Sequence, residues 1–245
     1  PYTKMLGEDM PITALNGEEL LKLCNQLVVK PADSAQSKGL TLNISTPAEL
    51  KKALLYAREY SKDVLIQKQV DGEEARFIVF EGKASAVLLR QTPQLVGDGE
   101  STVQQLFDAE NKSRKEIVDS AVLYPSLSSK LIEKYDSSLI PANQEVLELS
   151  RSTLIRDGAS VYDIISTIDH SYIQIVQSIA QHLGADFIVI DLMMKDYKAP
   201  ADGINYSLIE FNELPSLKLC YSCRDGNHYD ILGDLLPLIE LTLKH

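Results

Sequence analysis

Apolar residues in the first part of the chain form short runs of strand length, interrupted by one segment with helical spacing. The runs occur at residues 27–30, 40–44 and 64–68. The helical segment begins at Thr46, with Pro47 in its first turn and Glu49 completing a capping box. Together these elements predict a small α+β unit.

Two longer apolar runs follow at residues 75–80 and 84–90, and they flank residues 81–83, of sequence Glu-Gly-Lys. A glycine in such a short connection can adopt positive φ, so this pattern predicts a β-hairpin. Further along, apolar residues at helical spacing predict a second amphipathic helix over residues 171–183. Gly184 supplies the signal for its end.

The stretch between these elements is more polar. From about residue 100 to 141 the chain has one short amphipathic patch, formed by Val103, Leu106 and Phe107. We expect this stretch to be a helical excursion from the core. The apolar positions of residues 231–243 predict a closing helix.

Oxygen-bearing side chains close two consecutive apolar runs in the last third of the chain. Residues 187–191 end in Asp191, and residues 206–212 end with Glu210 and Asn212. Ionised carboxylates are costly to desolvate unless a cation meets them, and two acids plus an amide oxygen are donors that Mg²⁺ selects. The pattern indicates a metal site, and the alternative is that the acids merely cap strand ends in solvent.

A loop of small residues follows Lys30. It covers residues 31–39 and contains Lys38. Small side chains let backbone N–H groups approach an anion closely, and lysines add positive charge, so the loop suits a polyphosphate. The alternative is an ordinary turn, which small polar residues also favour.

Residues 67–74 leave a strand and enter a turn. Their backbone could bind the edge of a base while Lys68 meets a ring nitrogen and Glu74 accepts hydrogen bonds from ribose hydroxyls. The alternative is a charged hinge between sheets. Arg76 and Arg90 lie on the neighbouring strands, where a half-buried arginine usually has an anionic partner. Phosphate oxygens and the carboxylates of the metal site are both candidates.

The overall charge narrows the range of partners. The chain has 245 residues, with 24 Lys+Arg against 35 Asp+Glu, for a net charge of −11. This balance argues against nucleic-acid binding, which needs a basic surface. The apolar runs are much shorter than the roughly 20 residues of a spanning helix, and residues 1–16 do not have a signal-peptide pattern. We therefore expect a cytoplasmic protein that does not bind membranes, and the start at Pro1 suggests a missing upstream domain.

The cysteines point to a reducing compartment, because three are too few for a disulfide scaffold. They are Cys24, Cys220 and Cys223. The last two have C-x-x-C spacing with His228 nearby, but there is no second pair to complete a zinc site. We expect buried structural thiols, with zinc or redox chemistry as the alternative.

Four segments, taken in order, resemble the ATP-grasp ligases. The resemblance is to the branch that contains the C-terminal domain of bifunctional glutathione synthetase and the central domain of cyanophycin synthetase. The segments are Val28–Leu40, Leu89–Gly99, Gly158–Asp163 and Gly184–Pro215. The most specific signal is the Val-Gly-Asp-Gly run of residues 96–99 after Arg90.

This resemblance implies an α+β, ATP-grasp fold in which two α+β subdomains with antiparallel sheets clasp a nucleotide. Residues 25–75 would form the small, mobile lid subdomain. Residues 76–245 would form the large subdomain, with the helical excursion at about 100–141. Residues 1–24 would be a leader left from a missing or truncated N-terminal region.

The resemblance also assigns site residues. Those implied to bind ATP are Lys30, Ser34, Ser37, Lys38, Gln67, Lys68, Val70 and Glu74. Those implied to hold Mg²⁺, or Mn²⁺ in its place, are Asp191, Glu210 and Asn212. Arg90 would steady the γ-phosphate and the acyl-phosphate formed from it, with assistance from Arg76. Arg156 would contact a substrate carboxylate or phosphate.

The implied activity is that of an ATP- and Mg-dependent carboxylate-amine ligase, ADP-forming, which makes an amide or peptide-like bond through an acyl-phosphate. Its substrates would be amino acids or small peptides, as in glutathione biosynthesis or cyanophycin synthesis. One alternative is a nucleotide-binding module without ligase activity of its own. Another is a structural or protein-interaction domain, which would have no affinity for ATP.

The chain departs from the branch at several positions. Ser34 and Ser37 stand where the branch tends to have glycines, and Ser216 replaces a glycine after the proline. Residues 156–158, of sequence Arg-Asp-Gly, stand where a Thr-Gly-Gly-like run is expected. Because Ser216 and residues 156–158 line the acceptor side, the identity of the two substrates stays open. Homo-oligomer formation is possible and is not specified by the sequence.

Overall fold

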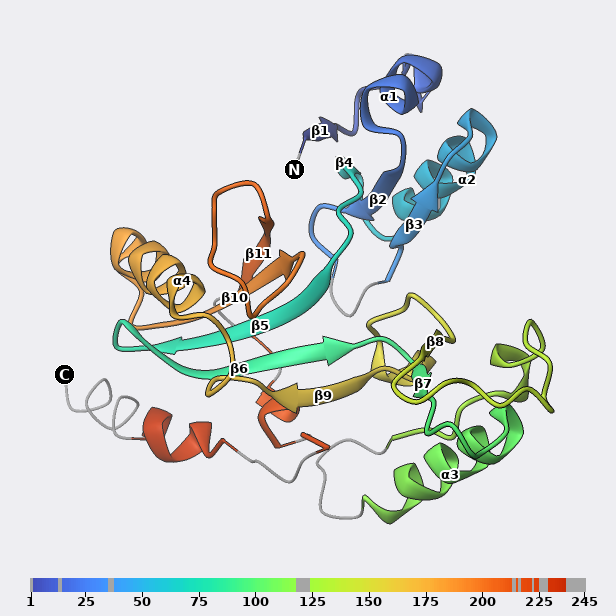
Figure 1. Cartoon of the computed structure of the whole chain (residues 1–245). Coiled ribbons are helices and arrows are strands. Elements are labelled where there is room, and N and C mark those ends of the chain that lie inside the picture. The colour runs from blue at the N-terminus through green and yellow to red at the C-terminus, as the bar shows by residue number, and fades with distance from the viewer. Residues whose placement is uncertain are drawn as a thin grey trace. The chain divides into compact units, whose positions relative to one another are not determined.

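The computed structural model describes residues 2–12, 15–34, 38–117, 124–212, 215, 217–221, 223–224 and 229–236. The chain divides into two compact units (Figure 1), the first ending at Asp71 and the second beginning at Gly72. Each unit has a hydrophobic core of its own.

Unit 1 is built on a four-stranded antiparallel sheet with the order β1-β4-β2-β3. Its elements are β1 Thr3–Leu6, α1 Gly17–Cys24, β2 Leu27–Pro31, β3 Thr41–Ile44, α2 Pro47–Arg58 and β4 Val64–Lys68. The predicted capping box between Thr46 and Glu49 is confirmed, and α2 buries Leu50 and Leu54 against the sheet. The segment before residue 25, which we expected to be a leader, supplies β1 and α1 to this unit.

Unit 2 is built on a five-stranded antiparallel sheet with the order β11-β10-β5-β6-β9. Its strands are β5 Glu73–Phe80, β6 Lys83–Gln91, β9 Ser160–Asp163, β10 Phe187–Met194 and β11 Tyr206–Asn212. The predicted hairpin joins β5 to β6 through Glu81 and Gly82, which have φ of 46° and 72°. The predicted second helix is α4 His170–Leu183, and Gly184 ends it in the left-handed conformation.

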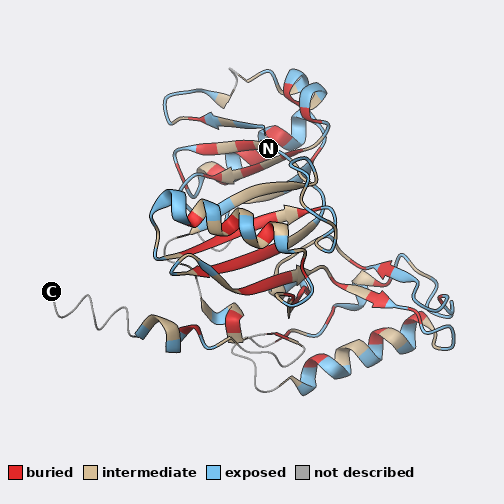
Figure 2. Cartoon of the chain, turned by 60° about the vertical axis from the view of Figure 1, so that its left-hand side comes forward, coloured by how far each residue is buried: buried red, intermediate tan, exposed pale blue. Residues whose placement is uncertain are grey.

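The two faces of the five-stranded sheet differ in chemistry. Phe77, Leu89 and Ile190 point to one face, where they pack with Tyr172 and Val176 of α4. Figure 2 shows α4 lying across the buried strands with its exposed residues turned outward. The other face is apolar around η4 Leu217–Tyr221 and charged elsewhere, as described below.

The excursion forms a small hydrophobic cluster together with the short strands that flank it. The excursion contains α3 Val103–Glu116 and η2 Ser129–Leu131, and the flanking strands are β7 Gln94–Val96 and β8 Val146–Glu148. The predicted patch of Val103, Leu106 and Phe107 packs in this cluster with Leu95 and Leu147. β7 pairs with β8 outside the five-stranded sheet.

Cys24, Cys220 and Cys223 are buried and form no disulfide, which confirms the expectation of buried thiols. Burial raises the pKa of Cys220 to about 11, so this thiol stays protonated at neutral pH. Of the predicted closing helix, residues 231–236 are helical and the remainder lies outside the described residues, as does His228. In the described part of the chain, no helix has both the length and the apolar character needed to cross a membrane.

The Val-Gly-Asp-Gly run has a structural role. Gly97 exchanges backbone hydrogen bonds with Gln144 and Glu145, both of 2.8 Å, and a Cβ at Gly97 would lie 2.2 Å from the carbonyl oxygen of Ala142. Asp98 accepts hydrogen bonds from the backbone N–H groups of Glu100 and Ser101 and from the Ser101 hydroxyl. The run therefore fixes the turn that leads into α3.

We expect Gly97→Ala to destabilise the chain by several kcal/mol, on the order of 2–4, because the added methyl forces two backbone segments apart. Gly82→Ala is the matched control, since Gly82 has positive φ but open space around it and should cost only about 1 kcal/mol. Urea denaturation measures both. Equal costs for the two variants would contradict the proposed close approach.

A second prediction concerns pH. Bonds from Ser101 and Glu100 lower the pKa of Asp98 from 3.8 to about 2. Because the folded-state pKa is depressed, the stabilisation by Asp98 is present above the ordinary pKa and is lost as the pH falls toward 2. The difference in thermal midpoint between wild type and Asp98→Asn should be constant above about pH 5 and shrink below about pH 4. A difference that persists unchanged at the acidic end would refute this.

Candidate functional site

Five of the residues predicted from the sequence meet on the face of the five-stranded sheet opposite α4. The register pairs Arg76 of β5 with Asp191 of β10, and Asp191 in turn with Glu210 of β11. Glu74 pairs with Arg90 of β6 on the same face, two residues along the strands. Since paired residues of antiparallel strands share a face, these side chains form one group, which we call the charged row.

Arg76 and Asp191 form a buried bidentate ion pair. Nε of Arg76 lies 2.8 Å from Oδ1 of Asp191, and its terminal nitrogen lies 2.7 Å from Oδ2. Arg76 is 9% exposed and Asp191 2%. Of the two partners left open for Arg76, phosphate or a metal-site carboxylate, the structure contains the carboxylate.

The position of Asp191 corrects one expectation. We expected Asp191 to close its strand, but β10 continues to Met194. The reason is that Leu192 and Met194 maintain the alternation of buried residues on the α4 face. Asp191 therefore lies inside a strand, where its charge needs a partner.

The surroundings of Arg76 favour its charged form. Burial alone lowers the pKa of Arg76, but the hydrogen bonds and charge of Asp191, followed by the charges of Glu74 and Glu210, raise it overall. Loss of either partner would leave one buried charge uncompensated, and the cost of that exceeds the net value of the pair.

Glu74 has two protein partners. Its Oε1 lies 2.6 Å from Arg90, and its Oε2 accepts a hydrogen bond of 2.5 Å from the hydroxyl of Thr153. Thr153 was not predicted, and its sequence context gives no signal for a site. A ribose contact by Glu74 would have to share these oxygens.

The remaining metal-ligand candidates lie at the edge of the sheet. Glu210 is exposed, and the amide nitrogen of Asn212 lies 3.2 Å from its Oε1. The described residues contain no cluster of three or more His, Cys, Asp or Glu side chains suited to a metal, so the third oxygen of this set would be an amide. Each oxygen of Asp191 keeps a second lone pair beyond its bond to Arg76, and the set therefore fits Mg²⁺.

In unit 1, the two predicted nucleotide-binding lysines lie on opposite faces of the sheet. Lys30 pairs with Leu65 and is half-buried, whereas Lys68 pairs with Leu27 at the end of β4 and is exposed. Val70 follows as a half-buried residue.

The other predicted ATP contacts in unit 1 have local partners. The amide nitrogen of Gln67 donates to the hydroxyl of Thr3, and the hydroxyl of Ser34 donates to the carbonyl of Lys38. Ser37 lies outside the described residues. The bond from Ser34 closes the loop on itself.

Arg156 stands apart from the charged row. It belongs to the short helix η3 Ile155–Asp157, and 65% of its side chain is exposed. Its ionic partner among the described residues is Asp157, at 3.9 Å. The side chain is free to meet a ligand from solvent.

The comparison with known proteins identifies relatives along most of the chain. No family model matches the sequence. The glutathione biosynthesis bifunctional protein GshAB of Streptococcus mutans is 30% identical over 250 residues, covering 94% of this chain and 33% of that protein. Cyanophycin synthetase of Trichormus variabilis is 23% identical, covering 87% of this chain and 24% of that protein. The chain thus spans a third or less of the length of these relatives.

Solved structures agree on the fold. A bifunctional glutathione synthetase from Pasteurella multocida gives a TM-score of 0.61 at 22% identity, covering 98% of this chain and 34% of that chain. A D-alanine–D-alanine ligase from Bacillus anthracis gives a TM-score of 0.56 at 20% identity, covering 99% of this chain and 62% of that chain. At these identities the likeness establishes the fold alone.

The buried ion pair generates a prediction. Asp191→Asn should destabilise the chain by roughly 3–5 kcal/mol, because it leaves the Arg76 guanidinium buried without its counter-charge. Glu210→Gln is the matched control. Because Glu210 is exposed, this substitution should change the free energy of unfolding by no more than about 0.5 kcal/mol. Both are measured by urea denaturation.

A double variant separates charge loss from packing loss. Arg76→Met combined with Asp191→Leu removes both charges and should recover much of the stability lost in Asp191→Asn. If Asp191→Asn unfolds at the wild-type urea concentration, the pair does not stabilise the sheet.

Proposed function

We propose that this chain, which is an ATP-grasp domain, forms the ATP-dependent catalytic part of a carboxylate-amine ligase. The observation that carries the proposal is the charged row, in which three acids and two arginines from four strands share one face of the sheet. Such a surface can hold a divalent cation and a phosphate group side by side. The relatives that match most of the chain are named for glutathione biosynthesis and for cyanophycin synthesis.

In this proposal, Asp191, Glu210 and Asn212 hold Mg²⁺, which would neutralise charge on the phosphates of ATP. Arg76 fixes the carboxylate of Asp191 in one orientation through its two hydrogen bonds. Arg90 steadies the γ-phosphate. For this, the guanidinium would exchange its ion pair with Glu74 for a contact to the phosphate. Arg76 is then a positioning residue, in contrast to the direct assistance that we expected from the sequence.

The reaction has two displacements. A substrate carboxylate oxygen attacks the γ-phosphorus and the bond to the β-phosphate oxygen breaks, which gives an acyl-phosphate and ADP. The amine nitrogen of the second substrate then attacks the acyl carbon, loses a proton and expels phosphate. Arginines near the transferred group offset the negative charge in both steps.

The other ATP contacts in this proposal are those that the resemblance implies. In unit 1, Lys30 and the loop that contains Ser34, Ser37 and Lys38 would contact phosphates, and Gln67, Lys68 and Val70 would contact the adenine. Glu74 of β5 would contact the ribose. Arg156 would meet a substrate carboxylate. The substrates in this proposal are amino acids or small peptides, and an additional N-terminal domain, as in the longer relatives, would complete their cleft.

A nucleotide-binding module without ligase activity is the competing proposal. It is favoured by one observation, namely that Arg90, Glu74 and Thr153 already satisfy one another in the described structure. In that case ATP binds but no phosphate is released.

The test combines binding with turnover. Mg-ATP should raise the thermal midpoint of the chain, because a ligand that binds only the folded state stabilises it. Pairs of amino acids should then stimulate phosphate release, measured on the full-length parent protein. Glu210→Gln should lower Mg-dependent release by at least about a hundredfold while the fold stays intact, whereas Glu100→Gln, also exposed, should not.

Two outcomes decide between the proposals. ATP binding without release under every substrate pair would favour the binding module. No thermal shift with Mg-ATP would exclude both.

A further inference from the structure

A cavity of about 370 Å³ lies between the excursion and the edge strand β9. Its polar lining includes Gln91, Ser113, Ser160 and Tyr162, and α3 and β7 supply an apolar wall with Leu95 and Leu106 among others. The size is sufficient for a ligand as large as an amino-acid derivative.

This cavity is separate from the charged row. In β9, Val161 pairs with Arg90 and shares its face, whereas Ser160 and Tyr162 pair with Gln91 and Leu89. Because successive residues of a strand point to opposite faces, Ser160, Tyr162 and Gln91 lie on the face opposite Arg90.

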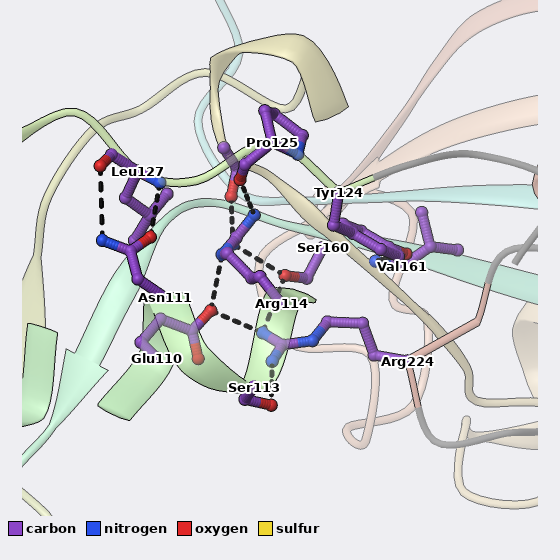
Figure 3. A network of polar contacts seen from close by, with 11 residues as sticks. Glu110, Asn111, Ser113, Arg114, Tyr124, Pro125, Leu127, Ser160, Val161 and Arg224 are labelled. Carbon is purple, nitrogen blue, oxygen red and sulfur yellow. Dashed lines mark hydrogen bonds and ion pairs between the residues drawn. The ribbon is translucent and has the colours of Figure 1, made fainter. Parts of the chain in front are cut away.

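Two arginines at the cavity share one carboxylate. Nε of Arg114 lies 2.8 Å from Oε1 of Glu110, and a terminal nitrogen of Arg224 lies 2.6 Å from the same oxygen. Figure 3 shows this oxygen between the two guanidinium groups, which come from α3 and from the segment beside β9. The side chains of Arg114 and Arg224 are only 1% and 10% exposed.

The charges of the cavity do not balance. Among its described lining residues, Arg114 and Arg224 carry two positive charges and Glu110 carries the single negative one, which leaves +1. Burial, together with the positive charge of Arg224, holds the pKa of Arg114 below its ordinary value even though Glu110 opposes this shift. In a chain with a net charge of −11, such a buried positive excess calls for an anion.

The two arginines have different roles. Arg114 also donates to the carbonyl oxygens of Pro125 and Gly158, so its guanidinium is engaged by the protein. Arg224 donates through its terminal nitrogens to Glu110, Ser113 and Ser160, and its guanidinium lines the cavity.

The serines add donors. Ser113 accepts a hydrogen bond from Arg224, and Ser160 accepts from both arginines. Since each hydroxyl oxygen is used as an acceptor, each hydroxyl hydrogen remains for donation. The two serines therefore present hydroxyl hydrogens to an anion in the cavity, beside the positive charge of Arg224.

We propose that this cavity binds a small organic monocarboxylate, of the size of an N-blocked amino acid. One negative charge matches the excess of +1, whereas a phosphate dianion would leave one negative charge unbalanced. The apolar wall formed with Leu95 and Leu106 accommodates a carbon skeleton, which inorganic phosphate lacks. The site does not depend on the proposed ligase activity, because it lies on the other face of the sheet.

The ligand test uses a matched pair. N-acetyl-L-alanine carries the carboxylate, and N-acetyl-L-alaninamide replaces it with a neutral group of the same size. In NMR titrations without ATP, at ionic strength fixed with sodium chloride, the acid should shift the amide resonances of Ser160 and Val161 and bind at least about tenfold more tightly than the amide. Inorganic phosphate, as a third arm, should bind more weakly than the acid.

The variant test keeps the arginine network. Gln91→Glu places a carboxylate opposite Ser160, where it supplies the missing negative charge. The variant should bind N-acetyl-L-alanine at least about tenfold more weakly than wild type. Gln174→Glu makes the same change of charge on the exposed side of α4 and should have no effect. Arg224→Gln should weaken binding as Gln91→Glu does.

Several results would overturn this assignment. Equal binding of acid and amide, no binding of either, or tighter binding of phosphate would each exclude a monocarboxylate site. Unchanged affinity in Gln91→Glu would show that the charge excess does not attract the ligand. Mg-ATP binding, measured on the same variants, should be unaltered, so a failure here is distinguishable from a failure of the proposed ligase function.

Discussion

The ion pair between Arg76 and Asp191 constrains the rest of unit 2. It joins the two central strands β5 and β10 across 115 residues of sequence, with both partners buried. A shift of either strand by one residue would turn one of the charges into the apolar core under α4, which is prohibitively costly. The pair therefore specifies the register that also places Glu210 and the Arg90–Glu74 pair on one face.

Local features of the fold could be predicted from the sequence because short-range chemistry determines them. The capping box of Thr46, the turn at Gly82 and the end of α4 at Gly184 each depend on a few neighbouring residues. The resemblance identified the fold and the residues of the charged row. The partner of Arg76, the full length of β10 and the role of Thr153 could not be predicted, because long-range strand pairing decides them.

The most specific motif of the sequence has a structural basis. Gly97 permits a close backbone approach, and Asp98 binds the N–H groups that precede α3. These contacts hold the excursion beside the end of β6, from which Arg90 and Gln91 point to opposite faces. A motif that identifies a catalytic family can thus act by positioning elements and need not touch a substrate.

The two faces of the sheet have opposite charge balances, and this difference explains why each suits its own ligand. In the charged row, three carboxylates against two guanidinium groups leave −1, which favours a divalent cation. Among the described residues that line the cavity beside β9, two guanidinium groups against one carboxylate leave +1, which favours an anion. Arg76 and Asp191 in the charged row and Arg114 and Arg224 at the cavity are buried, and burial strengthens the effect of charge on binding. The same electrostatic argument therefore supports a metal on one side of β9 and β6 and a carboxylate on the other.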